Sequence, residues 1–174
     1  TYPEYLTWKE ATAGGKGWTI KYYKGLGTSS ASEAKHYFSN LDTHVIDFGV
    51  SEDDDAAALD LAFNKKRADD RKDWLLSMRP GTFVNYAVPV MPVREFVNKE
   101  LILFSAADNI RSIPSAIDGL KPAQRKVLFA CFKRNLVKDE IKVAQLAGYV
   151  SEHAAYHHGE ASLAATIVSM AQNF

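Results

Sequence analysis

At 174 residues the chain is long enough to bury the core of one ordinary domain or two small ones, and its 47% apolar and 24% charged residues are typical of globular proteins. Basic and acidic residues number 21 each, so the net charge is zero, which excludes a uniformly basic nucleic-acid arm. The lone cysteine, Cys131, excludes an internal disulfide and a cysteine-rich zinc site, and it indicates a reducing, intracellular compartment.

The start of the sequence and its hydropathy bear on its context. The chain begins with Thr1 rather than Met, which predicts that it is a piece of a longer protein, and its first residues are unlike a signal peptide. It contains no apolar run of about 18 residues, so we expect no membrane partner.

The first predicted elements are two short strands that flank a helix. Apolar residues at alternate positions within 18–24 predict a half-buried strand, and a second strand is expected over 44–48. Between them, Ser30-Ala-Ser-Glu33 is typical of a capping box, which opens a helix that we expect to end near Asn40.

Acidic and proline-containing segments punctuate the middle of the chain. The acidic loop 52–55 leads into a helix, whose N-terminal dipole favours negative charge, and a second helix carries Trp74. Prolines and valines over 88–92 are typical of a linker or an edge strand. Because the composition changes here, we predict two domains, 1–85 and 86–174.

The C-terminal part has the pattern of a small helical domain. We predict a helix from Phe96 that ends around 107–109, one that begins at Lys121-Pro122, a short one over 143–149 followed by a turn at Ser151, and one that opens at Gly159-Glu160. Such helices are compatible with a helix-turn-helix unit, although many small helical domains share the pattern.

Positive charge gathers in one region although the whole chain is neutral. Residues 94–142 hold ten basic groups and six acidic ones, an excess of four. Within this segment, Lys121, Arg125 and Lys126 lie at the predicted start of a helix, where backbone N–H groups and cationic side chains both attract phosphate. The alternative is a solvated helix end that binds no ligand.

A second dense group of polar residues is Tyr156-His157-His158-Gly-Glu160, with His153 one helical turn before His157. Imidazoles at this spacing can share a metal ion, but a third and a fourth ligand are not apparent. Hydrogen bonding to phosphate oxygens at the start of the next helix, together with Ser162, is therefore favoured. The alternative is that the histidines only satisfy a turn.

Two further segments carry weaker signals. Residues 24–29, Lys-Gly-Leu-Gly-Thr-Ser, have the small residues and the basic flank of a phosphate cradle, but the Walker spacing is absent, which disfavours ATP binding here. Arg71 and Lys72 lie within Asp69-Asp-Arg-Lys-Asp73, where a solvated helix face with internal charge pairs is the simplest interpretation.

Blocks of sequence along the whole chain resemble the eukaryotic-type type IIA DNA topoisomerases, the DNA topoisomerase II family. These blocks are residues 21–28, 61–66, 69–75, 96–105, 107–114, 118–122, 124–129, 142–147, 155–160 and 171–174. Several blocks in the family's order are far more specific than any single motif above.

The resemblance implies a fold and a reaction. The fold would be α+β, with 1–85 as the C-terminal tail of a Toprim domain, a Rossmann-like α/β fold, plus connector helices, and 86–174 as the helical first part of a winged-helix domain with a helix-turn-helix. The family passes one DNA duplex through a transient double-strand break in another, using ATP and magnesium, as a homodimer in the nucleus. This chain would be part of its DNA gate, the breakage-reunion core.

The resemblance also implies roles for individual residues. Arg111, His157 and His158 would lie beside the cleaved phosphate and stabilise the charge that grows on it. Contacts to the duplex backbone would come from the remaining candidates, Arg71, Lys72, Lys121, Arg125, Lys126, Tyr156 and Ser162. Such contacts fix the register of the DNA without reading its sequence, so the expected partner is duplex DNA of any sequence.

Parts of the family's machinery have no counterpart in this sequence. The family's nucleophilic tyrosine directly follows an arginine, and none of the eight tyrosines here does. We expect that tyrosine downstream of Phe174, the magnesium ligands upstream of Thr1 and the ATPase module elsewhere in the parent protein. We therefore expect this piece to bind duplex DNA without cleaving it, and to bind no metal or ATP through its own residues.

Two other functions are open on the residues alone. One is a stand-alone winged-helix DNA-binding module without enzymatic activity, which would prefer one DNA site by several kcal/mol. The other is a protein-interaction scaffold in which the basic turn is incidental, so that changing Lys121 and Arg125 to Ala would leave DNA affinity unchanged.

Overall fold

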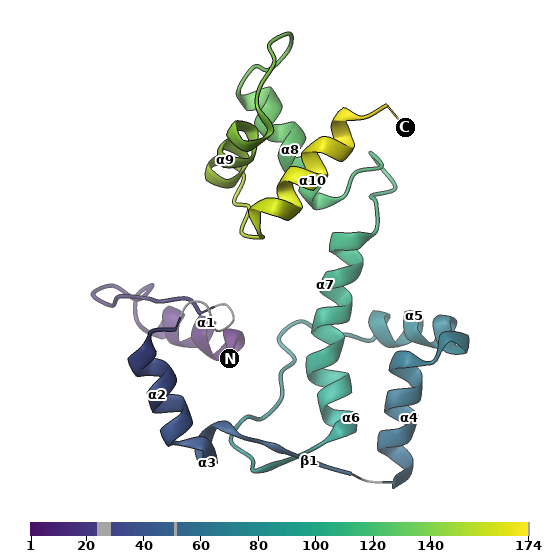
Figure 1. The fold of residues 1–174 in the computed structure, drawn as a ribbon. Coiled ribbons are helices and arrows are strands. Elements are labelled where there is room, and N and C mark those ends of the chain that lie inside the picture. The colour runs from purple at the N-terminus through teal and green to yellow at the C-terminus, as the bar shows by residue number, and fades with distance from the viewer. Residues whose placement is uncertain (24–28, 51, 174) are drawn as a thin grey trace. The chain divides into compact units, whose positions relative to one another are not determined.

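The computed structural model describes residues 1–23, 29–50 and 52–173, which form two compact units, Thr1–Phe104 and Ser105–Phe174 (Figure 1). Both units are mainly helical, and the described residues include a small parallel sheet, so the expected α+β class is confirmed. The units divide at Phe104, within a helix. The domain boundary predicted between residues 85 and 86 refers to the domains of the parent enzyme, and it stays a prediction.

The described part of the first unit is built mainly from short helices. They are α1 (Tyr2–Ala11), α2 (Ala31–Ser39), α3 (Leu41–His44), α4 (Glu52–Phe63), α5 (Ala68–Leu76) and α6 (Val93–Phe96). A capping box opens α1 and α2. At the start of α2, the Ser30 hydroxyl accepts the Glu33 N–H at 3.3 Å, and the Glu33 carboxylate accepts the Ser30 N–H at 2.6 Å. The predicted capping box is thus confirmed.

The strand predicted over 18–24 is wrong for the part that the structure describes. Residues 18–23 form neither helix nor strand. Trp18 instead packs edge-to-face on Trp8, with ring centroids 5.6 Å apart, and Lys21 and Tyr23 both donate hydrogen bonds to Glu33. Alternation alone does not make a strand, because a strand also needs a neighbouring backbone to pair with.

A two-stranded parallel sheet joins two distant segments of the first unit. Strand β1 (Asp47–Gly49) pairs with β2 (Val90–Pro92), with Phe48 opposite Met91. The strand predicted over 44–48 starts late because His44 ends α3, whereas β2 confirms the edge-strand alternative for 88–92 over its last three residues. Gly49 is required by close packing, since a Cβ atom there would lie 2.8 Å from Val90 Cγ1.

The core of the first unit forms where α4 and α5 meet the segment that follows α6. Ala58, Trp74, Val97 and Ile102 are its buried members. Between α6 and α7 (Ile102–Ser112) the helix takes a π-helical turn over Val97–Leu101. This wider turn brings Val97 and Ile102, five residues apart, onto the same side, and the Trp74 indole N–H donates to Asn98 Oδ1 at 2.9 Å.

Helix α7 runs further than the sequence predicts. The helix expected to end around 107–109 continues to Ser112. Asn109 donates from its side chain to the Ser105 carbonyl oxygen at 3.1 Å, and the Ser112 hydroxyl donates to Asp108 at 3.0 Å. Each side chain bonds to a group one helical turn earlier. Neither therefore competes with the hydrogen bonds of the helix backbone, as Asn and Ser side chains do where they end a helix.

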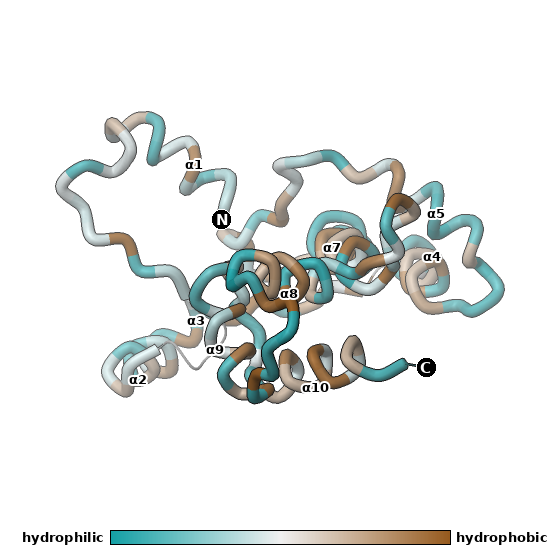
Figure 2. Tube along the Cα trace, turned by 90° about the horizontal axis from the view of Figure 1, so that it is seen from above, coloured by the Kyte–Doolittle hydropathy of each residue, from teal (hydrophilic) through white to brown (hydrophobic). Residues whose placement is uncertain are grey.

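The second unit is built on three helices around one apolar core. They are α8 (Pro122–Lys133), α9 (Val143–His153) and α10 (Glu160–Ala171). The core consists of Val127, Ala130, Leu146, Ala147, Val150, Tyr156, Leu163 and Ile167. Figure 2 shows apolar positions recurring along α8 and α10 between polar ones, as expected of helices that bury one face.

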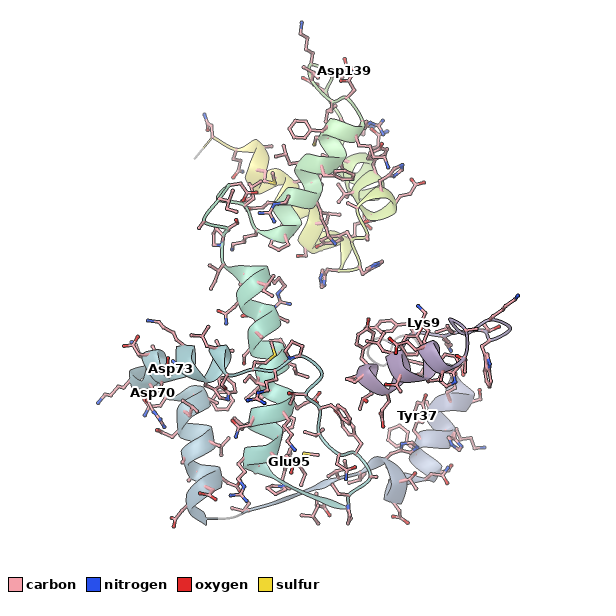
Figure 3. The ribbon with its side chains drawn as sticks, turned by 180° about the vertical axis from the view of Figure 1, so that it is seen from behind. Lys9, Tyr37, Asp70, Asp73, Glu95 and Asp139 are labelled. Atoms are coloured by element: carbon pink, nitrogen blue, oxygen red, sulfur yellow. The ribbon has the colours of Figure 1, made fainter. Side chains whose placement is uncertain are left out.

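The ends of these helices test the remaining predictions. The starts of α8 and α10 are confirmed at Pro122 and at Glu160, with Lys121 and Gly159 as N-caps. The turn predicted at Ser151 is wrong, because α9 continues to His153. Val150, fully buried, lies in this last turn, so core packing extends the helix. Loop 134–142 joins α8 to α9, and Figure 3 shows Asp139 at its tip.

A buried carboxylate links α4 to α6 in the first unit. The Asp55 side chain is only 2% exposed, and its carboxylate accepts the Arg94 backbone N–H at 2.7 Å. Arg94 lies in the first turn of α6, where N–H groups have no partner within the helix. Asp55 on α4 therefore caps α6, and the neighbouring Asp54 pairs with the Arg94 guanidinium.

This cap should be one of the larger single contributions to the stability of the first unit. We expect Asp55→Ala to lower the free energy of unfolding by about 2–3 kcal/mol, because a buried N–H loses a charged acceptor. Asp55→Asn, which keeps an acceptor oxygen, should cost less. Urea denaturation followed by tryptophan fluorescence measures both, and equal midpoints for Asp55→Ala and the unaltered chain would contradict the assignment.

Candidate nucleic-acid interface

The second unit contains a pocket where two helices begin and α7 ends. Its volume is about 290 Å³. It is lined by Arg111, Pro122, Ala123, Lys126, Tyr156, His158 and Ser162. Five of these seven are candidates from the sequence, and the lining residues come from α7, α8, α10 and the turn before α10.

Two helix N-termini open onto this pocket. Pro122 and Ala123 are the first two residues of α8, and Ser162 lies in the first turn of α10. The Lys121 N–H is occupied by Gln124 Oε1 at 2.9 Å, whereas at α10 no side chain among the described residues caps the helix at Gly159. The partial positive charge of both helix starts therefore favours an anion here.

Arg111 adds a full positive charge at the α7 end of the pocket. Its guanidinium donates to Asp108 one helical turn earlier, and this hydrogen bond lowers the pKa of the Asp108 carboxyl. The pair is largely exposed, so water competes for it and its net contribution to stability is small. A guanidinium has five N–H donors, so Arg111 can bond an anion while it keeps Asp108.

Arg125 lies one turn along α8 and faces a neighbouring pocket. Its guanidinium binds Asp118 in a bidentate way, with N–O distances of 2.9 and 2.7 Å, and also donates to the Leu120 carbonyl oxygen at 3.2 Å. The hydrogen bond from Arg125 is the largest cause that lowers the Asp118 pKa, to about 2, and the Leu120 N–H adds to it. Arg125 shares the Pro122 wall with the first pocket but does not line it.

The turn before α10 places aromatic and imidazole groups together. Tyr156 is 6% exposed and belongs to the apolar core, and its ring meets His158 edge-to-face at 5.5 Å. His158 is exposed and lines the pocket, whereas His157 is exposed and does not. His153 is stacked on Tyr149 at 4.0 Å and does not line the pocket.

Lys126 and Lys121 contribute to this region in different ways. Lys126 lines the pocket, and its ammonium donates a hydrogen bond to the Ala155 carbonyl oxygen at 2.7 Å. Lys121 is exposed at the N-cap of α8, next to the pocket residue Pro122, but is not itself a lining residue. The basic turn predicted from the sequence is thus split between the pocket and its rim.

Arg71 and Lys72, in the first unit, have separate partners. The Arg71 guanidinium donates to the carbonyl oxygens of Leu61 and Asn64, at 3.1 and 2.6 Å, and so satisfies the C-terminal end of α4. Lys72 is exposed and pairs with Asp69 at 2.6 Å, as the charge-pair interpretation predicts. The candidate phosphate cradle at 24–29 falls largely on 24–28, which lie outside the described residues.

Sequence reasoning missed the groups that hold these cations. Asp118 and the Ala155 carbonyl oxygen were not candidates, although Asp118 lies seven residues before Arg125 and one turn before α8. Among the described residues, no three His, Cys, Asp or Glu side chains converge on a point where a metal ion could be held. The described His, Cys, Asp and Glu side chains therefore do not fit a magnesium site. Nor does a described helix have the length and apolar character needed to span a bilayer.

The Asp118–Arg125 pair should show in a pH titration. The pKa of this carboxyl is lowered in the folded chain, so the pair is fully formed above about pH 4 and is lost as the pH falls towards 2. By NMR, the Asp118 carboxyl carbon should stay in its ionised position down to about pH 3, and in Arg125→Gln its midpoint should rise towards the usual value of about 4, since the largest cause of the lowering is removed. A midpoint near 4 in the unaltered chain would contradict the bidentate pair.

Comparison with known proteins supplies the family. Residues 1–109 match the family model described as the C-terminal associated domain of TOPRIM, and residues 111–174 match that of the A subunit of DNA gyrase/topoisomerase IV. The crystal structure of the Plasmodium falciparum topoisomerase II DNA-binding, cleavage and re-ligation domain matches with a TM-score of 0.77 and 53% identity, covering 100% of this chain and 24% of that one.

Curated relatives agree with the structural comparison. DNA topoisomerase 2 of Meyerozyma guilliermondii is 58% identical over 172 residues, and that of Arabidopsis thaliana is 56% identical over 173. In each case the alignment covers 99% of this chain and 12% of the relative, so the chain spans about an eighth of the relatives' length. Because both family models match and the 58% identity extends over 99% of the chain, the chain belongs to the DNA topoisomerase II family.

Proposed function

We propose that the pocket at the starts of α8 and α10 binds the phosphate backbone of duplex DNA within the DNA gate of a type II topoisomerase. The observation that carries this proposal is the convergence of Arg111 and His158 with two helix N-termini on one concave surface. Each of these groups favours an anion, and a phosphodiester is the anion that DNA offers. The similar Plasmodium domain, which is named for DNA binding, cleavage and re-ligation, supports it.

The residues would divide the work between the reacting phosphate and its neighbours. Arg111 and His158 line the pocket, and we assign them, with the adjacent His157, to the phosphate that is cleaved, where a guanidinium and imidazole hydrogen-bond donors stabilise the charge of the transition state. Lys121 and Arg125, on the rim, are assigned to neighbouring phosphates.

Other groups complete this proposed surface. Ser162 lies beside the α10 N–H groups, and the Tyr156 hydroxyl is the polar end of an otherwise buried ring. Arg71 and Lys72 remain a predicted pair of DNA contacts. Of the two, Lys72 is the better placed to exchange its partner for a phosphate, because its pair with Asp69 is exposed.

The fold and the parent enzyme are proposed at a finer level from the same resemblance. Helices α8, α9 and α10 would be the helical first part of a winged-helix domain with its helix-turn-helix. The parent would be an ATP-dependent, magnesium-requiring homodimer in the nucleus that passes one duplex through another. Its nucleophilic tyrosine, magnesium ligands and ATPase module are not assigned to residues of this chain.

Salt-dependent DNA binding tests the proposal. We expect similar affinity for duplexes of unrelated sequence, and we expect Lys121→Ala and Arg125→Ala each to weaken binding and to lower the slope of log K against log salt by about 1, since each removes a phosphate contact. Fluorescence anisotropy between about 50 and 200 mM salt measures this.

The control is Lys35→Ala, an equal change of charge on the exposed face of α2, which should leave the slope unchanged. Two results would count against the proposal. A preference of several kcal/mol for one site would favour a winged-helix regulator. Unchanged affinity in the Lys121 and Arg125 variants would favour the scaffold.

A further inference from the structure

The turn between α9 and α10 holds an alanine in a conformation that alanine rarely adopts. Ala155 has a φ of 47°, in the left-handed region where the Cβ atom crowds the following carbonyl oxygen. Ala154 caps α9 just before it, and Tyr156 follows directly. A residue in such a conformation stays there only when surrounding contacts hold it.

One of these contacts comes from α8. The Lys126 ammonium donates to the Ala155 carbonyl oxygen over 2.7 Å, and this bond joins residues that lie 29 apart in the sequence. A charged donor makes a shorter and stronger hydrogen bond than a neutral one. Lys126 is half-buried, so part of its long side chain is withdrawn from water, and its ammonium reaches the turn at the exposed surface.

The peptide group that Lys126 holds directly precedes residues on the polar side of the pocket. The carbonyl that Lys126 holds belongs to the peptide group that joins Ala155 to Tyr156, so its orientation sets the direction in which Tyr156 enters the apolar core. The Tyr156 ring in turn packs edge-to-face on His158, which lines the pocket. Lys126, the turn and His158 are thus one continuous chain of contacts.

We propose that Lys126 is a positioning residue, which promotes DNA binding by holding the left-handed turn at Ala155 and thereby placing Tyr156 and His158. This departs from the direct contact with the DNA backbone that the family resemblance implies for Lys126. The proposal rests on the proposed function of the pocket, because it takes the pocket to be the site where phosphate binds.

A rescue experiment in the full chain tests this role. Lys126→Met keeps the side chain's length and removes the donor, and we expect it to weaken binding to a short duplex by about tenfold. Adding Ala155→Gly should restore at least about half of that loss on a logarithmic scale, because glycine adopts a positive φ without the Cβ penalty. The matched control is Lys121→Met, which loses an equal charge at the start of α8 and should gain nothing from Ala155→Gly.

A second variant breaks the turn and keeps the lysine. A β-branched residue is strained at a positive φ, so Ala155→Val should weaken DNA binding about as much as Lys126→Met while the salt slope stays that of the unaltered chain. Ala155→Val keeps Lys126 and its charge, so this variant tests the role of the turn even if Lys126→Met fails to fold. Unchanged affinity in Ala155→Val would overturn the proposal.

An NMR measurement without DNA separates this inference from the function of the pocket. Lys126→Met should shift the signals of Tyr156 and His158 and speed their amide exchange, leave Leu163 in the core protected, and be reversed by Ala155→Gly. If these shifts appear while Arg111→Ala and Lys121→Met leave DNA affinity unchanged, the proposed function fails, and of the inference only the holding of the turn by Lys126 stands. If Ala155→Gly restores nothing and Lys126→Met lowers the salt slope as much as Lys121→Met, Lys126 contacts phosphate and the inference is wrong.

Discussion

The organisation of the second unit depends on how α8 and α10 pack. Val127 on α8 and Leu163 on α10 belong to the same buried core, and each lies within the first two turns of its helix. Packing them together brings the two helix starts onto one pocket, with Ala123 and Ser162 in its wall. Apolar burial thus creates a site of positive potential, which a single helix end would supply only weakly.

Such a concentration of positive charge is unfavourable unless anions balance it, and the chain supplies carboxylates of its own. Asp108 binds Arg111 and Asp118 binds Arg125, both in exposed pairs that contribute little to stability because water competes for them. A phosphate can therefore join or replace these carboxylates at low cost. Lys126 is held instead by a backbone carbonyl oxygen, and such a bond contributes to the shape of the site rather than to its exchangeable charge.

The same distinction, between a carboxylate partner and a backbone carbonyl partner, separates the two candidate cations of the first unit. Arg71 is held by two backbone carbonyl oxygens at the end of α4, and Lys72 by an exposed carboxylate. The partner of a cation is therefore informative about its role. Cations bonded to the backbone fix helix ends and turns, and cations bonded to exposed carboxylates can be offered to a ligand. Asp55 is the acidic counterpart of the first kind, since it closes the start of α6.

Local signals in the sequence predicted several of the helix starts, and distant contacts explain most of what it missed. The capping box at Ser30 and the openings of α8 and α10 depend on residues within one turn, so they could be predicted. The strand over 18–24 depended on a pairing partner that its own residues do not encode. The basic residues at the start of α8 could also be found from local sequence. The bond from Lys126 to Ala155, in contrast, arises only when α8 packs near the turn between α9 and α10.

The central claim is that a DNA phosphate occupies the pocket at the starts of α8 and α10. A crystal structure of the chain with a short duplex tests it most directly. We predict a phosphate oxygen within hydrogen-bond distance of Arg111 and His158, at the start of α10, which no described side chain caps. A duplex whose backbone lies on another surface, with this pocket untouched, would contradict it.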